Sequence, residues 1–378
     1  MFYSLMLILC AYGLASSVQK GSPFIEDRSR KRCGIIPVRS NEKLLYFLLV
    51  AGVSLFSGLR SRYNDTGNYV FAYLYTIEPS LSSLSGLPLE DGIGFLIYET
   101  IVKIFCGSNY ARFLTVTAFI TIGSFILFFR KYSSNFSVAV YLLITTTFYS
   151  FTMGGIRQSL AMAVVIWAIP NFIKKRYLRG LIYVLLATSI HQFSILYLVA
   201  LFLMGNVWTI KTMMIVLATV VVSFGFTEIF GKVAEITGYS EQDLAGSAGT
   251  NILRTLVWLV PVALSFLYKK KINVSCDKYG KLFINLSLVG AMIMILASFG
   301  GANLLGRMAY YFYPLYILAV IEIIEVAMNV RDTKIMRLCC MAGFLMYFVA
   351  LSMGSGGFFE DHYRHNSISD LFRSMPLE

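Results

Sequence analysis

The stretch Met153-Gly-Gly-Ile-Arg157-Gln158-Ser-Leu-Ala-Met-Ala opens an apolar segment. A basic turn, Lys174-Lys-Arg-Tyr-Leu-Arg179, follows it, and then comes Ala187-Thr-Ser-Ile-His191-Gln-Phe-Ser194. Apolar segments joined by short basic turns are typical of a chain that crosses a membrane repeatedly. Polar side chains such as Arg157, Gln158 and His191 are costly at membrane depth, so their presence there indicates function.

The composition of the whole chain agrees with this interpretation. The 378 residues are 57% hydrophobic and only 14% charged, with a mean hydropathy of +0.70, whereas soluble domains carry about a quarter charged residues. We therefore predict an all-α polytopic membrane protein of about 10–12 transmembrane helices, some of them re-entrant or broken. The expected spans are 2–17, 43–59, 111–129, 135–153, 156–173, 208–226, 251–268, 282–299, 308–326 and 336–353, with 91–106 and 181–204 ambiguous.

The domain organisation predicted from this pattern is simple. Residues 1–353 are expected to form a single transmembrane domain with outer loops at 60–110 and 227–250. Residues 354–378, which open with a Gly-Ser-Gly-Gly run, are expected to form an extracytoplasmic C-terminal tail that is mobile or acts as a lid.

The net charge of +12 is concentrated in short turns between apolar segments, as the positive-inside rule predicts, so we expect no nucleic-acid partner. All the basic turns are cytoplasmic together only if 91–106 does not cross the membrane and 181–204 enters and returns, with His191 at its tip. The alternative is a single span at 181–204 and one turn that breaks the charge rule.

Four arginines stand at or near the outer starts of expected helices: Arg112, Arg157, Arg254 and Arg307. A helix N-terminus favours an anion, and the planar guanidinium matches phosphate oxygens. Several such ends in one cavity would bind a pyrophosphate at the outer membrane surface. Arginine near lipid headgroups also serves as a simple anchor, and Arg112, which has no supporting motif, fits that role better.

The outer loop after the second span reads Arg60-Ser-Arg62-Tyr-Asn-Asp65-Thr-Gly-Asn-Tyr69. Arg60 and Arg62 add positive charge, and Asp65 is placed to accept a proton from a sugar hydroxyl. The alternative for Asp65 is a turn stabilised by its own side chain.

His191 has three open roles, namely a base, a hydrogen-bond partner of a sugar and an internal helix tie. Tyr310, with the neighbouring tyrosines 311, 313 and 316, would stack on sugar rings or form an interfacial aromatic belt. His362 and His365 have metal-like spacing but no fixed scaffold, and the six cysteines show no C-x-x-C pair, so we predict no metal site and no cofactor.

Three places in the chain resemble the EpsG-type branch of the Wzy-like bacterial polysaccharide polymerases. They are Arg60 to Tyr69, similar to the family's R-x-x-x-G-x-D-T-x-x-Y; Gly155-Ile-Arg157-Gln158 to Ala161, followed by His191 and Ser194; and Gly306-Arg307 before Tyr310-Tyr311-Phe312. The resemblance covers about residues 44–350, and its middle motif is the most specific.

This resemblance implies a glycosyltransferase of GT-C-like architecture in the bacterial cytoplasmic (inner) membrane, with its site facing the periplasm or exterior. Its substrate would be an undecaprenyl-pyrophosphate-linked oligosaccharide, polymerised without a metal, with a flippase and a chain-length regulator as pathway partners. Arg60, Arg62, Tyr69, Arg157, Gln158, Arg254, Arg307 and Tyr310 would bind pyrophosphate or sugar, and Asp65 or His191 would act as the base. The alternatives are an O-antigen ligase-type glycosyltransferase and a lipid-linked sugar flippase or transporter, although the chain lacks the internal repeat typical of transporters.

Overall fold

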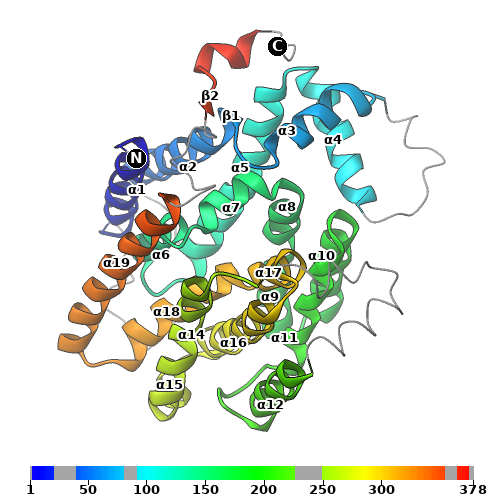
Figure 1. Ribbon diagram of the computed structural model, residues 1–378. Coiled ribbons are helices and arrows are strands. Elements are labelled where there is room, and N and C mark those ends of the chain that lie inside the picture. The colour runs from blue at the N-terminus through cyan, green and yellow to red at the C-terminus, as the bar shows by residue number, and fades with distance from the viewer. Residues whose placement is uncertain (1, 21–39, 81–91, 226–248, 354–363, 374–378) are drawn as a thin grey trace. The chain divides into compact units, whose positions relative to one another are not determined.

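The computed structural model describes residues 2–20, 40–80, 92–225, 249–353 and 364–373. These residues are mostly helical, and the chain is an all-α polytopic membrane protein (Figure 1). By its internal contacts the chain divides into two compact units, which are described separately below. The first comprises Met1–Ala168, Leu178–Ile195 and Arg337–Glu378, and the second comprises Ile169–Tyr177 and Leu196–Met336.

The secondary structure follows the chain in a simple order. The elements up to residue 165 are α1 (Phe2–Lys20), α2 (Ser40–Gly58), β1 (Arg60–Arg62), α3 (Thr66–Phe71), the π-helix η2 (Ala72–Thr76), α4 (Ile93–Cys106), α5 (Tyr110–Tyr132), α6 (Phe136–Thr145), α7 (Phe148–Gly154) and α8 (Ile156–Val165). The later elements are α9 (Ala168–Ile173), α10 (Tyr177–Ile190), the 3₁₀-helix η4 (Gln192–Leu198), α11 (Val199–Phe202), α12 (Ile210–Phe224), α14 (Ile252–Leu267), α15 (Lys269–Ser275), α16 (Lys278–Phe299), α17 (Ala302–Tyr310), α18 (Tyr313–Ala327), α19 (Val330–Ser352), β2 (Arg364–His365) and the 3₁₀-helix η6 (Ile368–Phe372).

The helices agree closely with the spans predicted from hydropathy. Among the described residues, four helices are long and apolar enough to cross a membrane, or up to seven spans if each bent pair counts as one. Broken segments do occur, as predicted for the fold, but three of them lie in segments that were expected to be continuous. These are the pairs α6 with α7, α14 with α15, and α17 with α18, bent by 55°, 78° and 51°. Four further apolar helices are shorter, so the number of 10–12 crossings stays a prediction.

Polar residues between the apolar runs determine where several helices begin. The side chains of Asn109, Asn135 and Asp277 accept hydrogen bonds from the backbone N–H groups of Arg112, Val138 and Gly280. Such caps satisfy donors that the first helical turn leaves open. The breaks have local causes too: Thr147, between α6 and α7, has a left-handed backbone with φ of 66°.

In the first unit, α2 packs along α5, and α1 packs against α2 and α6 (Figure 1). Gly58, at the end of α2, permits the closest approach. A Cβ atom added there would lie 2.5 Å from the Thr115 Cα of α5. The contact is backbone to backbone, so no side-chain rotation can relieve it.

We therefore expect Gly58→Ala to lower the free energy of unfolding by about 1–3 kcal/mol, the usual cost of overpacking a close contact. Gly52→Ala on the same helix is the matched control, because a Cβ there meets nothing within 4 Å. The measurement is thermal unfolding of both variants in the same detergent. Equal stabilities would contradict the tight α2–α5 contact.

The second unit is built around α16, which contacts α12, α14, α17 and α18. Trp258 of α14 is fully buried, with its ring centroid 4.8 Å from that of Tyr313 in an edge-on arrangement. Glu322 of α18 is also fully buried, and its carboxylate lies against Gly280 in the first turn of α16. A helix N-terminus stabilises a carboxylate in that position.

Candidate functional site

Two stretches singled out in the sequence pack against each other in the first unit. The turn after β1 lies on the turn that precedes α8. The Thr66 hydroxyl donates to the Met153 carbonyl at 3.4 Å, and the Asn64 side chain lies against Gly154, where an added Cβ would be 3.2 Å away. The fold therefore brings the Arg60–Tyr69 stretch next to the Gly-Gly-Ile-Arg-Gln motif, about 90 residues later in the chain.

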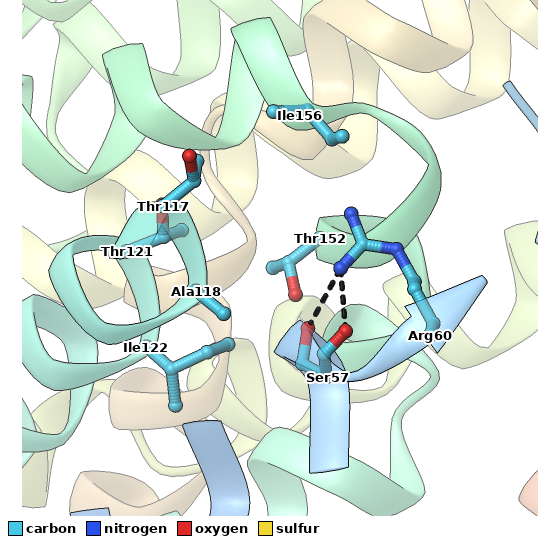
Figure 2. A pocket seen from close by; sticks show the side chains of 8 residues that line it. All are labelled: Ser57, Arg60, Thr117, Ala118, Thr121, Ile122, Thr152 and Ile156. Carbon is cyan, nitrogen blue, oxygen red and sulfur yellow. Dashed lines mark hydrogen bonds between the residues drawn. The ribbon is translucent and has the colours of Figure 1, made fainter. Parts of the chain in front are cut away.

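Arg60 faces inward rather than toward the outer surface. It is only 2% exposed; its Nε donates to the Thr66 hydroxyl at 3.1 Å, and its Nη1 donates to the Ser57 carbonyl and hydroxyl. Figure 2 shows it at the edge of a small cavity lined also by hydroxyls of Thr117, Thr121 and Thr152. The cavity volume is about 10 Å³, the size needed for one water molecule. In this conformation Arg60 ties the end of α2 to the following turn.

Arg157, the second residue of α8, connects the two halves of the central motif. Its Nε donates to the carbonyl oxygen of Ile190 at 2.8 Å. Ile190 ends α10 and directly precedes His191, which is half-buried in the break before η4. The structure thus brings Arg157 to the backbone beside His191, as expected if the two residues serve one site.

Gly92 lies on the other side of the Arg157 guanidinium. A Cβ at Gly92 would approach Nη2, Cζ and Nε of Arg157 to less than 3.0 Å, and the backbone of Gly92 has φ of 96°. This glycine is the N-terminal cap of α4. Two residues on, Gly94 makes a similarly close approach to Ser189 and Ile190 of α10. The start of α4, the end of α10 and the start of α8 therefore meet around Arg157.

Two charged residues of α4 were not singled out as site candidates from the sequence. Glu99 and Lys103 are both buried, and Arg157 is close enough to Glu99 to act on its charge. The only feature of the sequence that could have indicated them is a carboxyl and an ammonium group four residues apart in an otherwise apolar helix. Their proximity to Arg157, about 60 residues away in sequence, depends on the fold.

The other predicted residues of the first unit differ in accessibility. Arg62 and Asp65 are exposed, Gln158 is buried, and Tyr69 is half-buried with its ring 5.8 Å from that of Phe95 on α4. The Asp65 side chain makes no capping hydrogen bond, although its carbonyl accepts bonds from Asn68 and Tyr69. The Asp65 side chain therefore lies at the surface of the first unit, and its role as a base stays a prediction.

Three predicted binding residues belong to the second unit. Arg254 stands in the first turn of α14, as expected, whereas Arg307 lies in the last turn of α17. The difference arises because Gly301, with φ of 61°, starts that helix earlier than the hydropathy suggested. Tyr310 is buried and stacks on Tyr313 at 5.1 Å between ring centroids, so in this structure its ring belongs to the core of the second unit.

The described part of the tail, residues 364–373, packs against β1 and the start of α5 in the first unit. β2 pairs antiparallel with β1, and the Asn109 side chain donates to the carbonyls of Asp370 and Arg373. Arg112, expected to be an anchor or an anion ligand, donates to the Leu371 carbonyl instead. Burial lowers the pKa of His365, and the positive charge of Arg60 acts in the same direction. His362 lies outside the described residues.

Comparison with known proteins gives one positive result. A family model described as the EpsG family matches residues 43–363, which is most of the chain and includes every predicted site residue. No curated protein and no solved structure matches. The matched region contains the Arg157 motif, the strand that carries Arg60 and the arginines of the second unit. Because the match covers most of the chain, the chain belongs to the EpsG family.

Proposed function

We propose that this protein is a polysaccharide polymerase. It would transfer oligosaccharide repeat units linked to undecaprenyl pyrophosphate onto a growing chain, at the outer face of the cytoplasmic membrane and without a metal ion. The membership in the EpsG family supports a polymerase or glycosyltransferase role. The donor, the membrane face and the residue roles are our inference from the site.

The observation that carries this proposal is the hydrogen bond from Arg157 to the backbone beside His191. It holds a permanent positive charge at the start of α8, where a phosphate group is favoured. Among the residues that the structure describes, no group of three or more His, Cys, Asp or Glu side chains lies close enough to hold a metal ion. In our proposal the positive charge for the leaving group comes from arginine.

In the proposed reaction, the hydroxyl of the acceptor sugar attacks the anomeric carbon of the donor. The bond from that carbon to the pyrophosphate oxygen breaks, and the lipid pyrophosphate leaves with the electron pair. Arg157 stabilises the charge that develops on the pyrophosphate, with Arg62 as a second cation of the same unit. Asp65 or His191 accepts the proton of the hydroxyl.

The test is the fate of lipid-linked glycan in cells that lack the gene, compared with cells in which the wild-type gene is restored. We expect single repeat units displayed outside the cell and no long chains, because only chain growth is lost. Repeats trapped on the cytoplasmic face would identify a flippase instead, and long chains left on the lipid carrier would identify a ligase. An unchanged glycan profile would contradict all three functions.

A further inference from the structure

Thr66 carries a buried hydroxyl that joins two stretches of the candidate site, and the proposed reaction gives it no role. The side chain is fully buried at the start of α3. Its oxygen accepts a hydrogen bond from Nε of Arg60 at 3.1 Å, and it donates to the carbonyl of Met153 at 3.4 Å. Because a guanidinium can only donate, the single proton of the hydroxyl remains available for the Met153 carbonyl.

The first end of this series of hydrogen bonds is the last turn of α2. Nη1 of Arg60 donates to the carbonyl and the hydroxyl of Ser57 (Figure 2). The last carbonyls of a helix have no partner within the helix, and an arginine that follows can supply one. Arg60, Ser57 and Thr66 are all buried, so water does not readily replace these bonds. Arg60 therefore holds the Thr66 hydroxyl in place relative to the end of α2.

The other end is the connection from α7 to α8. Between Met153 and Arg157 the chain contains two successive glycines. Glycine has no side chain to restrict its backbone, so contacts from outside determine the course of this turn. The bond from Thr66 to Met153 is one such contact, and the Asn64 side chain against Gly154 is another. Both contacts come from the loop between β1 and α3.

The same loop carries the proposed base. Asp65 directly precedes Thr66, and its side chain is exposed. Arg157 stands four residues after Met153 and donates to the Ile190 carbonyl at 2.8 Å. One buried hydroxyl thus connects the backbone that carries the proposed base with the backbone that carries the proposed pyrophosphate ligand.

We propose that Thr66 is a positioning residue, whose hydroxyl, held by Arg60, fixes the start of α8 relative to the Asp65 loop and so aligns Arg157 for the transfer reaction. The inference rests on the proposed function, because it takes Arg157 and Asp65 as the groups that act on donor and acceptor. It assigns Arg60 to this alignment rather than to the donor. Loss of the hydroxyl keeps both reacting groups but misaligns them, so the rate falls while the donor still binds.

The experiment compares Thr66→Val, which keeps the shape and removes the hydroxyl, with Thr66→Ser, which keeps the hydroxyl and removes the methyl group. The polymerisation rate is measured in isolated membranes per amount of inserted protein. Binding of undecaprenyl pyrophosphate is measured on the purified full-length protein in detergent. We expect Thr66→Val to lower the rate on the order of 10–10²-fold, as for a displacement of up to about 1 Å at a reacting centre, with binding nearly unchanged. Thr66→Ser should keep nearly the wild-type rate.

Thr145→Val is the matched control, because Thr145 on α6 is also fully buried and its hydroxyl donates to the Tyr141 carbonyl of the same helix at 3.0 Å. It should keep the wild-type rate. If Thr66→Val does not reach the membrane, Asn64→Gly tests the same contact from the exposed side. Glycine adopts the φ of 42° found at Asn64 and removes the side chain that lies against Gly154, so the rate should fall with binding retained.

Several results would overturn the role of Thr66 and leave the proposed function standing. They are a wild-type rate in Thr66→Val or in Asn64→Gly, an equal loss of rate in Thr145→Val, and a greater loss in Thr66→Ser than in Thr66→Val. A loss of lipid pyrophosphate binding in proportion to the rate would also overturn it. If Arg157→Ala binds the lipid pyrophosphate and polymerises as well as wild type does, the proposed donor site fails, and the inference about Thr66 fails with it.

Discussion

Arg157→Ala should abolish long glycan chains in cells and reduce the polymerisation rate in isolated membranes on the order of 10²–10³-fold. That is the usual loss when one group that stabilises developing charge is removed. Arg157→Lys should remain strongly impaired, since lysine keeps the charge but loses the planar fork that matches two phosphate oxygens. Lysine also lacks the Nε that donates to the Ile190 carbonyl. The measurement is chain length and rate per amount of protein inserted in the membrane.

The matched control is Arg179→Ala, which removes an exposed arginine from the first turn of α10. It should leave the chain length unchanged. Full activity in Arg157→Lys would argue against bidentate phosphate binding, and normal chains in Arg157→Ala would remove this arginine from the site.

Gly92→Ala should reduce activity on the order of 10²-fold, although the substitution adds only one methyl group to a residue that has no side chain. The new Cβ would overlap the Arg157 guanidinium, and Arg157 is the more flexible partner, so its guanidinium would be displaced from its present position. Displacing a catalytic group by about 1 Å costs activity of that order. The left-handed backbone at Gly92, with φ of 96°, adds strain of about 1 kcal/mol for alanine.

Gly67→Ala is the control for this variant, because a Cβ at Gly67 meets nothing within 4 Å and the residue lies in the neighbouring helix α3. It should retain both activity and the thermal unfolding temperature. The two variants are compared by the polymerisation rate and by unfolding in detergent. A Gly92→Ala protein with wild-type activity would show that Arg157 does not need its present position.

The helices were largely predictable from the sequence, since each long apolar run became helical, although several runs divide into two helices at a break that was not expected. Hydropathy is a local property, and lipid forces the backbone to satisfy its own hydrogen bonds. The breaks were partly predictable as well. His191 does stand between two helices, as its place in a segment too long for one span suggested. Whether that segment returns to the outer face stays a prediction.

The site was predictable only where function shows as a local motif. Arg157 and His191 were singled out because polar residues are costly in apolar segments, and in the fold Arg157 donates to the backbone of Ile190, the residue before His191. Their roles stay predictions. Arg60 was also singled out, but its burial could not be predicted from the sequence. A strand of three residues is too short for its pattern of side chains to show which face is buried. The approach of Gly92 to Arg157 depends on the contact between the start of α4 and the end of α10, which no short pattern encodes.

The pairing of β1 with β2 has a consequence for biosynthesis. His365 and Arg60 are partners in the strand register, although about 300 residues separate them. At roughly 5–20 residues per second, the strand next to the candidate site waits roughly 15–60 s for its partner to be translated. Every intermediate product that stops before residue 364 carries an open strand edge beside Arg60. That edge therefore closes only after residue 364 has been translated, and the β1–β2 pair is among the last parts of the first unit to fold.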